Sequence, residues 1–271
     1  MREEEAAELV HTILAHHGVK GQKWGVRRAR KKAQKQAIQN YLGFGNQVQV
    51  RQHQRRLNAT LTEDRYKQLD THDFVIERGG IVKRTTKSPG HNGPAYVSTN
   101  ERDATNYRGL VPGWETGGPA RTHEGYFEVT MRATQNLRSP SERARVDAYI
   151  KLMDANEIKL GNGETINGRE YLRRQGLGHL VDELPSRELA LRYYGQLVAQ
   201  QGIKNEPINS AYFKLLEKKG YNALIDDNDR NILSQTPLLV LQPQKSLEHV
   251  EVKQLSTDEV LAAMASVKLP D

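Results

Sequence analysis

The sequence predicts an α+β fold in which a basic N-terminal arm precedes one globular domain. Segments rich in β-forming residues come first in the globular part, helical segments occupy its middle, and β-forming segments return near its end. This order favours an α+β domain over an alternating βαβ array with a parallel sheet. The sequence has no internal repeat, and 271 residues suffice for one large domain, or for one domain plus an arm.

The positive charge of the chain is concentrated at its N-terminal end. The whole chain has 40 Lys and Arg and 33 Asp and Glu, which gives a formal net charge of +7. Of these side chains, 12 basic and 4 acidic ones lie in residues 1–62, and residues 9–62 contain no carboxylate at all. Residues 63–271 are therefore close to neutral. Such a split indicates a polyanion or an acidic protein surface as the partner of the arm.

Helical and linker patterns divide the N-terminal region. Apolar residues at helical spacing predict a short helix over residues 3–16, and three glycines then interrupt the pattern. A helix is expected to resume near Val26, in a segment rich in Ala, Arg, Lys and Gln. The polar, Gln-rich segment that follows is typical of a linker. The predicted division is a basic docking arm over residues 1–42, a linker over 43–61 and the globular domain over 62–271.

The first elements of the globular domain are short. A capped helix is expected after Thr62, and two β-rich runs on either side of the Gly79-Gly80 pair predict a hairpin. Asn100 is expected to cap a helix, and the Gly- and Pro-rich residues 109–123 predict a long loop.

Helices then occupy the middle of the domain. Residues 125–134 alternate between apolar and polar side chains, which predicts a half-buried strand. Ser139 and Glu142 form a capping-box pattern that opens a helix ending near Met153, and Ser256 opens the last helix in the same way. The other helices expected cover residues 168–175, 186–201 and 210–219, followed by β-forming segments at 221–225, 237–241 and 247–252.

Composition excludes several classes of site. The chain has no cysteine, which excludes disulfides and thiolate metal sites, and its nine histidines show no metal-site spacing supported by a carboxylate. No metal is therefore expected. No apolar run approaches the roughly 20 residues that a membrane span requires, so no membrane contact is predicted.

The centre of the arm combines glycines, one large aromatic residue and basic side chains. The segment around Trp24 contains Lys20, Lys23, Arg27 and Arg28. Glycines that fold a backbone tightly, with a tryptophan as anchor, favour docking into a pocket on another protein. Two alternatives remain, since tryptophan also stacks on bases while basic residues contact phosphates, and charge runs are often solvated tails.

The segment HHGVKGQKWGVRR resembles a motif of head-associated proteins of tailed bacteriophages, including portal-linked minor capsid proteins and prohead protease fusions. The similarity covers about a dozen residues, from His17 to Arg28. It implies a location in the virion, inside or at the portal of the head, after assembly in the host cytoplasm. The portal or the major capsid protein is then the expected partner, with contact between the arm and packaged DNA as a further expectation.

The globular part resembles ADP-ribosyltransferase-like domains, which implies a split β-sheet with a helical insertion. Such domains place an Arg on the first core strand and a Ser-Thr-Ser strand after it. Here FVIERGG puts Arg78 in the first position, and AYVSTN puts Ser98 and Thr99 in the second. The resemblance implies that the Arg would hold the dinucleotide NAD and that the Ser would fix its nicotinamide end.

The third element of that pattern, a Glu before a late apolar strand, is absent. Ser234, Gln235 and Thr236 precede the strand that begins at Pro237. Asp226 and Asp227 lie upstream in a predicted tight turn, where Asp is also expected for backbone reasons. Arg78 is equally compatible with a structural ion pair, and the Ser98 region with a helix cap.

These features predict a virion protein that docks through its arm and carries a degenerate domain without enzymatic activity or bound cofactor. The alternative is an active mono-ADP-ribosyltransferase that is packaged in the head, uses NAD and enters the host with the genome. A third class, a plain nucleic-acid binder, is disfavoured because residues 63–271 have no basic excess.

Overall fold

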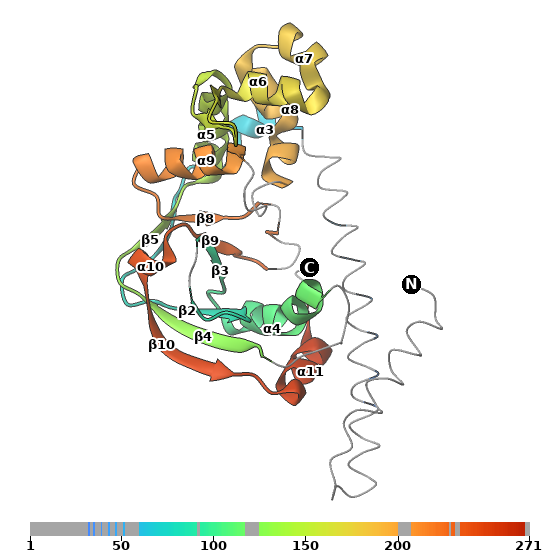
Figure 1. Ribbon diagram of the computed structural model, residues 1–271, viewed down its shortest axis with the longest axis vertical. Helices are drawn as coiled ribbons and strands as arrows, with labels where there is room; N and C mark the ends of the chain where they lie inside the picture. The colour runs from blue at the N-terminus through green and yellow to red at the C-terminus, as the bar shows by residue number, and fades with distance from the viewer. Residues whose placement is uncertain are drawn as a thin grey trace, which may run out of the picture.

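A mixed α+β domain forms the described part of the chain (Figure 1). The computed structural model describes residues 60–90, 93–116, 125–199, 207–227, 229–230 and 234–268, together with six single positions between residues 32 and 51. All six single positions are helical, including 43, 47 and 51 within the predicted linker. The α+β class predicted from the sequence is confirmed.

Two three-stranded antiparallel sheets form the main β structure of the domain. Their strand orders are β10-β4-β2 and β3-β9-β8. An antiparallel bridge between Lys83 and Ser98 joins β2 to β3, so the two sheets meet along these strands. Buried Val82, Val129 and Leu238 belong to the apolar cluster shared by the two sheets. The strands are β2 Ile81–Thr86, β3 Ala95–Val97, β4 Phe127–Ala133, β8 Ala223–Ile225, β9 Leu238–Val240 and β10 Leu247–Gln254.

The predicted hairpin across Gly79-Gly80 is wrong. Strand β1 (Phe74–Ile76) pairs with β5 (Leu137–Ser139), whereas β2 pairs with β4. Gly79 has a φ of 90° and its N–H donates to Ala133 O at 2.8 Å, while Ala133 N–H donates to Gly80 O at 2.9 Å. The chain therefore bends at the glycines. Strands β1 and β2 do not pair with each other, because β1 pairs with β5 and β2 pairs with β4.

Helix α4 (Glu101–Thr116) begins as predicted after Asn100 but extends into the predicted loop 109–123. It packs against α11 (Thr257–Ser266), and the two helices share an apolar cluster that includes Leu110 and Met264. A Cβ atom added at Gly109 would lie 2.8 Å from Met264 N, so a glycine is required for this close approach. Gly109, which contributes to the loop prediction in the sequence, therefore lies at the packing contact between α4 and α11.

The predicted helical insertion lies between β5 and β8. Its core contains Tyr149 and Tyr212, whose rings stack with centroids 4.1 Å apart. The cap of α5 is Ser141, because Ser139 belongs to β5, so the predicted capping position is wrong by two residues. The insertion comprises α5 Glu142–Asp154, β6 Ile158–Lys159, β7 Thr165–Ile166, α6 Gly168–Leu172, the kinked segment η1 Arg173–Leu177, α7 Gly178–Glu183, α8 Ser186–Ala199 and α9 Pro207–Lys218.

Two short helices complete the fold. α3 (Glu63–Lys67) has the expected Thr62 cap, and α10 (Pro243–Ser246) leads into β10. Leu61 N–H donates to Leu191 O of α8 at 3.0 Å, so the chain entering the domain is attached to the helical insertion. Ser256 and Glu259 form the predicted capping box of α11.

Candidate functional site

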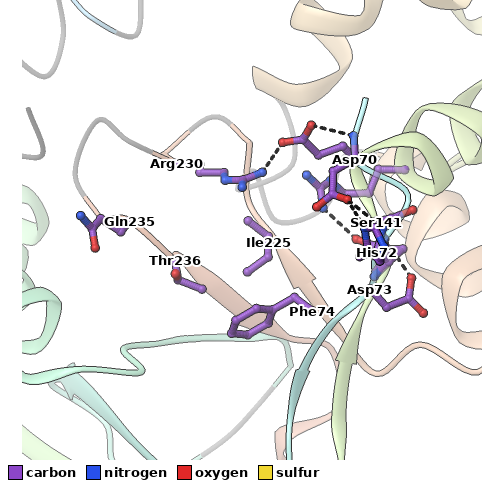
Figure 2. A pocket seen from close by; sticks show the side chains of 12 residues that line it. Asp70, His72, Asp73, Phe74, Ser141, Ile225, Arg230, Gln235 and Thr236 are labelled. Atoms are coloured by element: carbon purple, nitrogen blue, oxygen red, sulfur yellow. Dashed lines mark hydrogen bonds and ion pairs between the residues drawn. The ribbon is translucent and has the colours of Figure 1, made fainter. Parts of the chain in front are cut away.

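A cavity of about 170 Å³ lies where three distant segments of the chain meet (Figure 2). Its walls come from three segments. The first precedes and begins β1, the second is the N-terminus of α5, and the third runs from the end of β8 to the start of β9. The lining residues are Asp70, His72, Asp73, Phe74, Pro140, Ser141, Glu142, Arg145, Ile225, Arg230, Gln235 and Thr236. Its wall therefore combines carboxylates, cations and a small apolar surface.

One wall is a turn in which Asp70 and His72 contact each other. The Asp70 carboxylate accepts from His72 N at 2.9 Å and lies 2.8 Å from His72 Nδ1. The backbone hydrogen bond from His72, followed by its side-chain contact, lowers the pKa of Asp70. Asp70 is therefore ionised at neutral pH.

The second wall is the N-terminus of α5. Ser141 N donates to Asp73 Oδ1 at 3.1 Å, and Arg138 pairs with the other oxygen of Asp73 at 3.1 Å. Glu142 forms an ion pair with Arg230. In Figure 2, Arg230 extends toward this carboxylate from the opposite wall. Each of these carboxylates thus has a cationic partner.

The deepest charged residue of the cavity wall is Arg145. Its side chain is 2% exposed, and its guanidinium donates to Asp227 at 2.8 and 2.6 Å and to Pro140 O at 2.8 Å. Tyr194 also donates to Asp227, at 2.7 Å. Burial alone lowers the pKa of Arg145, but the Asp227 carboxylate outweighs it and the pKa is raised overall. The pair links the insertion to the segment after β8.

The two predicted Asp candidates have structural partners. Asp227 belongs to the buried pair with Arg145 and has a side chain that is 18% exposed. Asp226 is buried, and the hydroxyl of Tyr96 on β3 donates to its carboxylate. Burial, followed by the charge of Asp226, raises the pKa of Tyr96 well above its usual value. The predicted turn is present, since Asp229 N–H and Arg230 N–H both donate to Asp226 O.

The predicted Ser-Thr element lies at the end of β3, where the two sheets meet. Ser98 is buried and exchanges backbone hydrogen bonds with Lys83 at 2.7 and 2.9 Å. Thr99 is half-buried beside it. Asn100 accepts from Asp103 N at 2.9 Å, as the helix-cap interpretation predicted. Neither Ser98 nor Thr99 lines the cavity of Figure 2.

Arg78 does not lie beside the other candidates. It is exposed in the turn between β1 and β2, where its backbone N–H donates to Asn136 Oδ1 at 2.9 Å. Strand β1 ends at Ile76, and Arg78 does not line the cavity of Figure 2. The expectation of a core-strand arginine at position 78 is therefore wrong, because the chain has already left β1.

A different arginine lies on the strand beside the Ser-Thr element. Arg84 lies on β2, adjacent to Lys83, which pairs with Ser98. It is half-buried, and its pairing with Val129 places it on the same face of β2 as Val82, which pairs with Met131. The β-branched residues of the segment IVKRTT are the sequence signal for the strand that contains Arg84.

The cavity of Figure 2 does not have the size or the lining expected for NAD. A cavity of about 170 Å³ is smaller than the ~300–1,000 Å³ typical of pockets for drug-sized ligands, and a dinucleotide is larger still. The cavity lies beside Gln235 and Thr236, where the resemblance expects a Glu, but its carboxylates come from the opposite walls. The lining residues of Figure 2 therefore do not fit a whole NAD molecule.

The remaining sequence predictions have separate outcomes. The docking residues Lys20, Lys23, Trp24, Arg27 and Arg28 lie outside the described residues. Within the described ranges, no group of His, Asp and Glu has a geometry suited to a metal ion. Over the same ranges, no helix combines the length and the apolar character needed to cross a membrane.

Comparison with known protein families finds a match within the predicted arm. A model described as a family of unknown function (DUF7211) matches residues 7–31, which contain all five predicted docking residues. The match does not extend into the globular domain. No curated protein and no solved structure matches the chain.

Proposed function

We propose that this chain is a tailed-bacteriophage head protein that docks to the portal or the major capsid protein through its basic arm. In this proposal the globular domain is a degenerate ADP-ribosyltransferase-like module. The confinement of the positive charge to residues 1–62 supports docking through the arm. The match of a family model to residues 7–31 alone also supports treating the arm as a separate recognition unit.

The observation that carries the non-enzymatic assignment is the placement of the candidate residues. Arg78 lies in an exposed turn, and both Asp candidates are engaged, Asp226 by Tyr96 and Asp227 by Arg145. Cleavage of NAD develops positive charge on the ribose, and loss of one electrostatic stabiliser typically costs ~100- to 1,000-fold in rate. A carboxylate that is displaced by about 1 Å can itself cost ~100-fold.

The docking role is tested by deleting residues 9–35. We expect the shortened chain to be absent from assembled particles. Its globular domain should remain folded, and far-ultraviolet circular dichroism measures this. Normal incorporation of the shortened chain would exclude docking through the arm.

The contribution of Trp24 is tested by titrating the full chain against purified portal, capsid protein and DNA at low and high salt. Contacts of Arg27 and Arg28 with charged partners should weaken as salt rises, whereas a buried tryptophan anchor is worth about 2 kcal/mol or more and is not screened. Trp24→Ala should therefore remove the salt-resistant binding, and Arg27→Ala with Arg28→Ala the salt-sensitive part. Binding only to DNA, with a steep salt dependence, would replace the protein partner by nucleic acid.

One observation favours the second candidate function, a packaged transferase. Arg84 lies on β2 beside the residue that pairs with Ser98, so an arginine and the Ser-Thr element do lie on adjacent strands. Release of nicotinamide from NAD is the assay, with Arg84→Lys as the variant and the exposed Arg78→Lys as its matched control. We expect no turnover in the unaltered chain. Turnover that survives Arg78→Lys and disappears in Arg84→Lys would establish the transferase instead.

A further inference from the structure

Strand β10 forms a long, exposed edge of the first sheet. It has eight residues and pairs with β4 on one side, and no other described strand lies against its second side. Seven of its eight residues are exposed. Val250 and Val252 are 48% and 44% exposed, and they are two of the four large apolar side chains that are exposed in the described part of the chain. Such an edge presents unpaired backbone groups to another strand.

We propose that β10 pairs in antiparallel orientation with β10 of a second copy of this chain. The two sheets then join across a two-fold axis into one continuous sheet, with the same surface used by both copies. The occupant is a second copy because Glu248 and Lys253, which carry opposite charges near the two ends of β10, exchange places when the strand is reversed. This inference is independent of the function proposed for the arm.

A bulge in β10 makes this self-complementarity possible. Glu248 pairs with Arg132 of β4 and Lys253 pairs with Glu128, and the register shifts between His249 and Glu251. Residues 128 and 132 are four apart on a strand and lie on one face. Glu248 and Lys253 therefore also share a face, although they are five residues apart. Opposed side chains of antiparallel strands lie on the same face, so these two can oppose each other across the two-fold axis.

The register set by these charges brings Glu248 of each copy opposite Lys253 of the other. Two pairs of opposite charge form per dimer, the exposed Val252 lies opposite His249, and the bulges meet at the two-fold axis. In the proposed register Glu251 of each copy lies opposite Val250 of the other, whereas a displaced register in which Glu251 opposes Glu251 puts like charges in direct opposition and is disfavoured. Charges and bulges commonly protect edge strands from unselective pairing, and here the same features select one partner and one register.

Glu248 and Lys253 each have a partner within the same chain, and these ion pairs do not prevent pairing across the two-fold axis. Glu248 pairs with Arg132 at 3.2 Å, and both side chains are about half exposed. Lys253 pairs with Glu259 at 2.5 Å, and these side chains are 52% and 37% exposed. Exposed ion pairs contribute little to stability, so a change of partner costs little. A dimer would also present two basic arms together, which strengthens binding by effective concentration.

The test uses sedimentation equilibrium of the full chain with charge-reversal variants. We expect the unaltered chain to dimerise, and Glu248→Lys and Lys253→Glu each to weaken the dimer roughly 10- to 30-fold, because each change creates two like-charged pairs. An equimolar mixture of the two variants should regain the dimer, since each charge then meets its opposite. Arg132→Gln is the control, because it removes the local partner of Glu248 without altering the β10 charges.

The mixture distinguishes an interface from a local structural effect. A variant that merely damages β10 stays damaged when it is mixed with the other variant, and circular dichroism of each variant reports such damage separately. A monomeric unaltered chain, a dimer insensitive to both reversals, or a mixture that stays monomeric would each overturn the proposal.

Discussion

Removal of Asp227 is expected to destabilise the domain strongly, although the residue lies in a segment considered for catalysis. Arg145 is almost fully buried, with a side chain that is 2% exposed, and Asp227 neutralises it through two hydrogen bonds. Asp227→Ala leaves this guanidinium without its counter-charge, with Pro140 O as its remaining described acceptor. The expected cost is about 3–5 kcal/mol, the range found when one partner of a buried ion pair is deleted.

The reverse change should cost less, because the two partners differ in exposure. Arg145→Met retains most of the buried side-chain volume, and Asp227, at 18% exposed, keeps the hydrogen bond from Tyr194. A carboxylate that loses one partner under these conditions is expected to cost about 1–3 kcal/mol. The double variant Arg145→Met with Asp227→Leu replaces the whole pair by apolar groups and should recover most of the loss.

The assay is urea unfolding followed by circular dichroism, with thermal unfolding as a second measure. A loss of about 3–5 kcal/mol corresponds to a fall in melting temperature of roughly 6–20 °C for a domain of this size. If Asp227→Ala costs less than Arg145→Met, or if the double variant is worse than either single one, the assignment of Asp227 as the counter-charge of a buried arginine is refuted.

Three further predictions concern α4 and α11. Gly109→Ala should cost about 1–3 kcal/mol because its Cβ would lie 2.8 Å from a backbone atom of α11, whereas Gly161→Ala, in open space, should be nearly neutral in the same unfolding assay. Ser256→Ala should cost about 1 kcal/mol through loss of the capping box, and Ser256→Thr should restore most of it. Hydrogen bonds from Lys253 and then Ser256 lower the pKa of Glu259 from 4.5 to about 2, so its stabilising contribution is complete above the unfolded pKa of 4.5 and is lost as the pH falls toward 2. Unfolding midpoints measured across this interval should therefore fall less steeply in Glu259→Gln, and an unchanged slope would contradict the assigned pKa.

Local patterns account for the parts of the fold that the sequence predicted correctly. The caps at Thr62 and Ser256 and the alternation in the strand that became β4 depend on neighbouring residues alone. The α+β class follows from the order of such segments. Local patterns failed where a distant contact decided the outcome. Gly109 is predicted to lie in a loop, but it lies in α4, against which α11 packs. The hairpin expected across Gly79-Gly80 does not form, because β1 pairs with β5 and β2 pairs with β4.

The candidate site depended even more on tertiary structure. The cavity combines residues from three segments centred near positions 72, 142 and 230, and no spacing in the sequence connects them. Which arginine lies on the strand beside Ser98 was decided by the bridge between β2 and β3, and that residue is Arg84 and not Arg78. By itself the sequence determined the charge division between arm and domain, because charge depends only on composition along the chain. Only the tertiary structure decided which charged side chains face one another, because those distances depend on long-range strand pairing and helix packing.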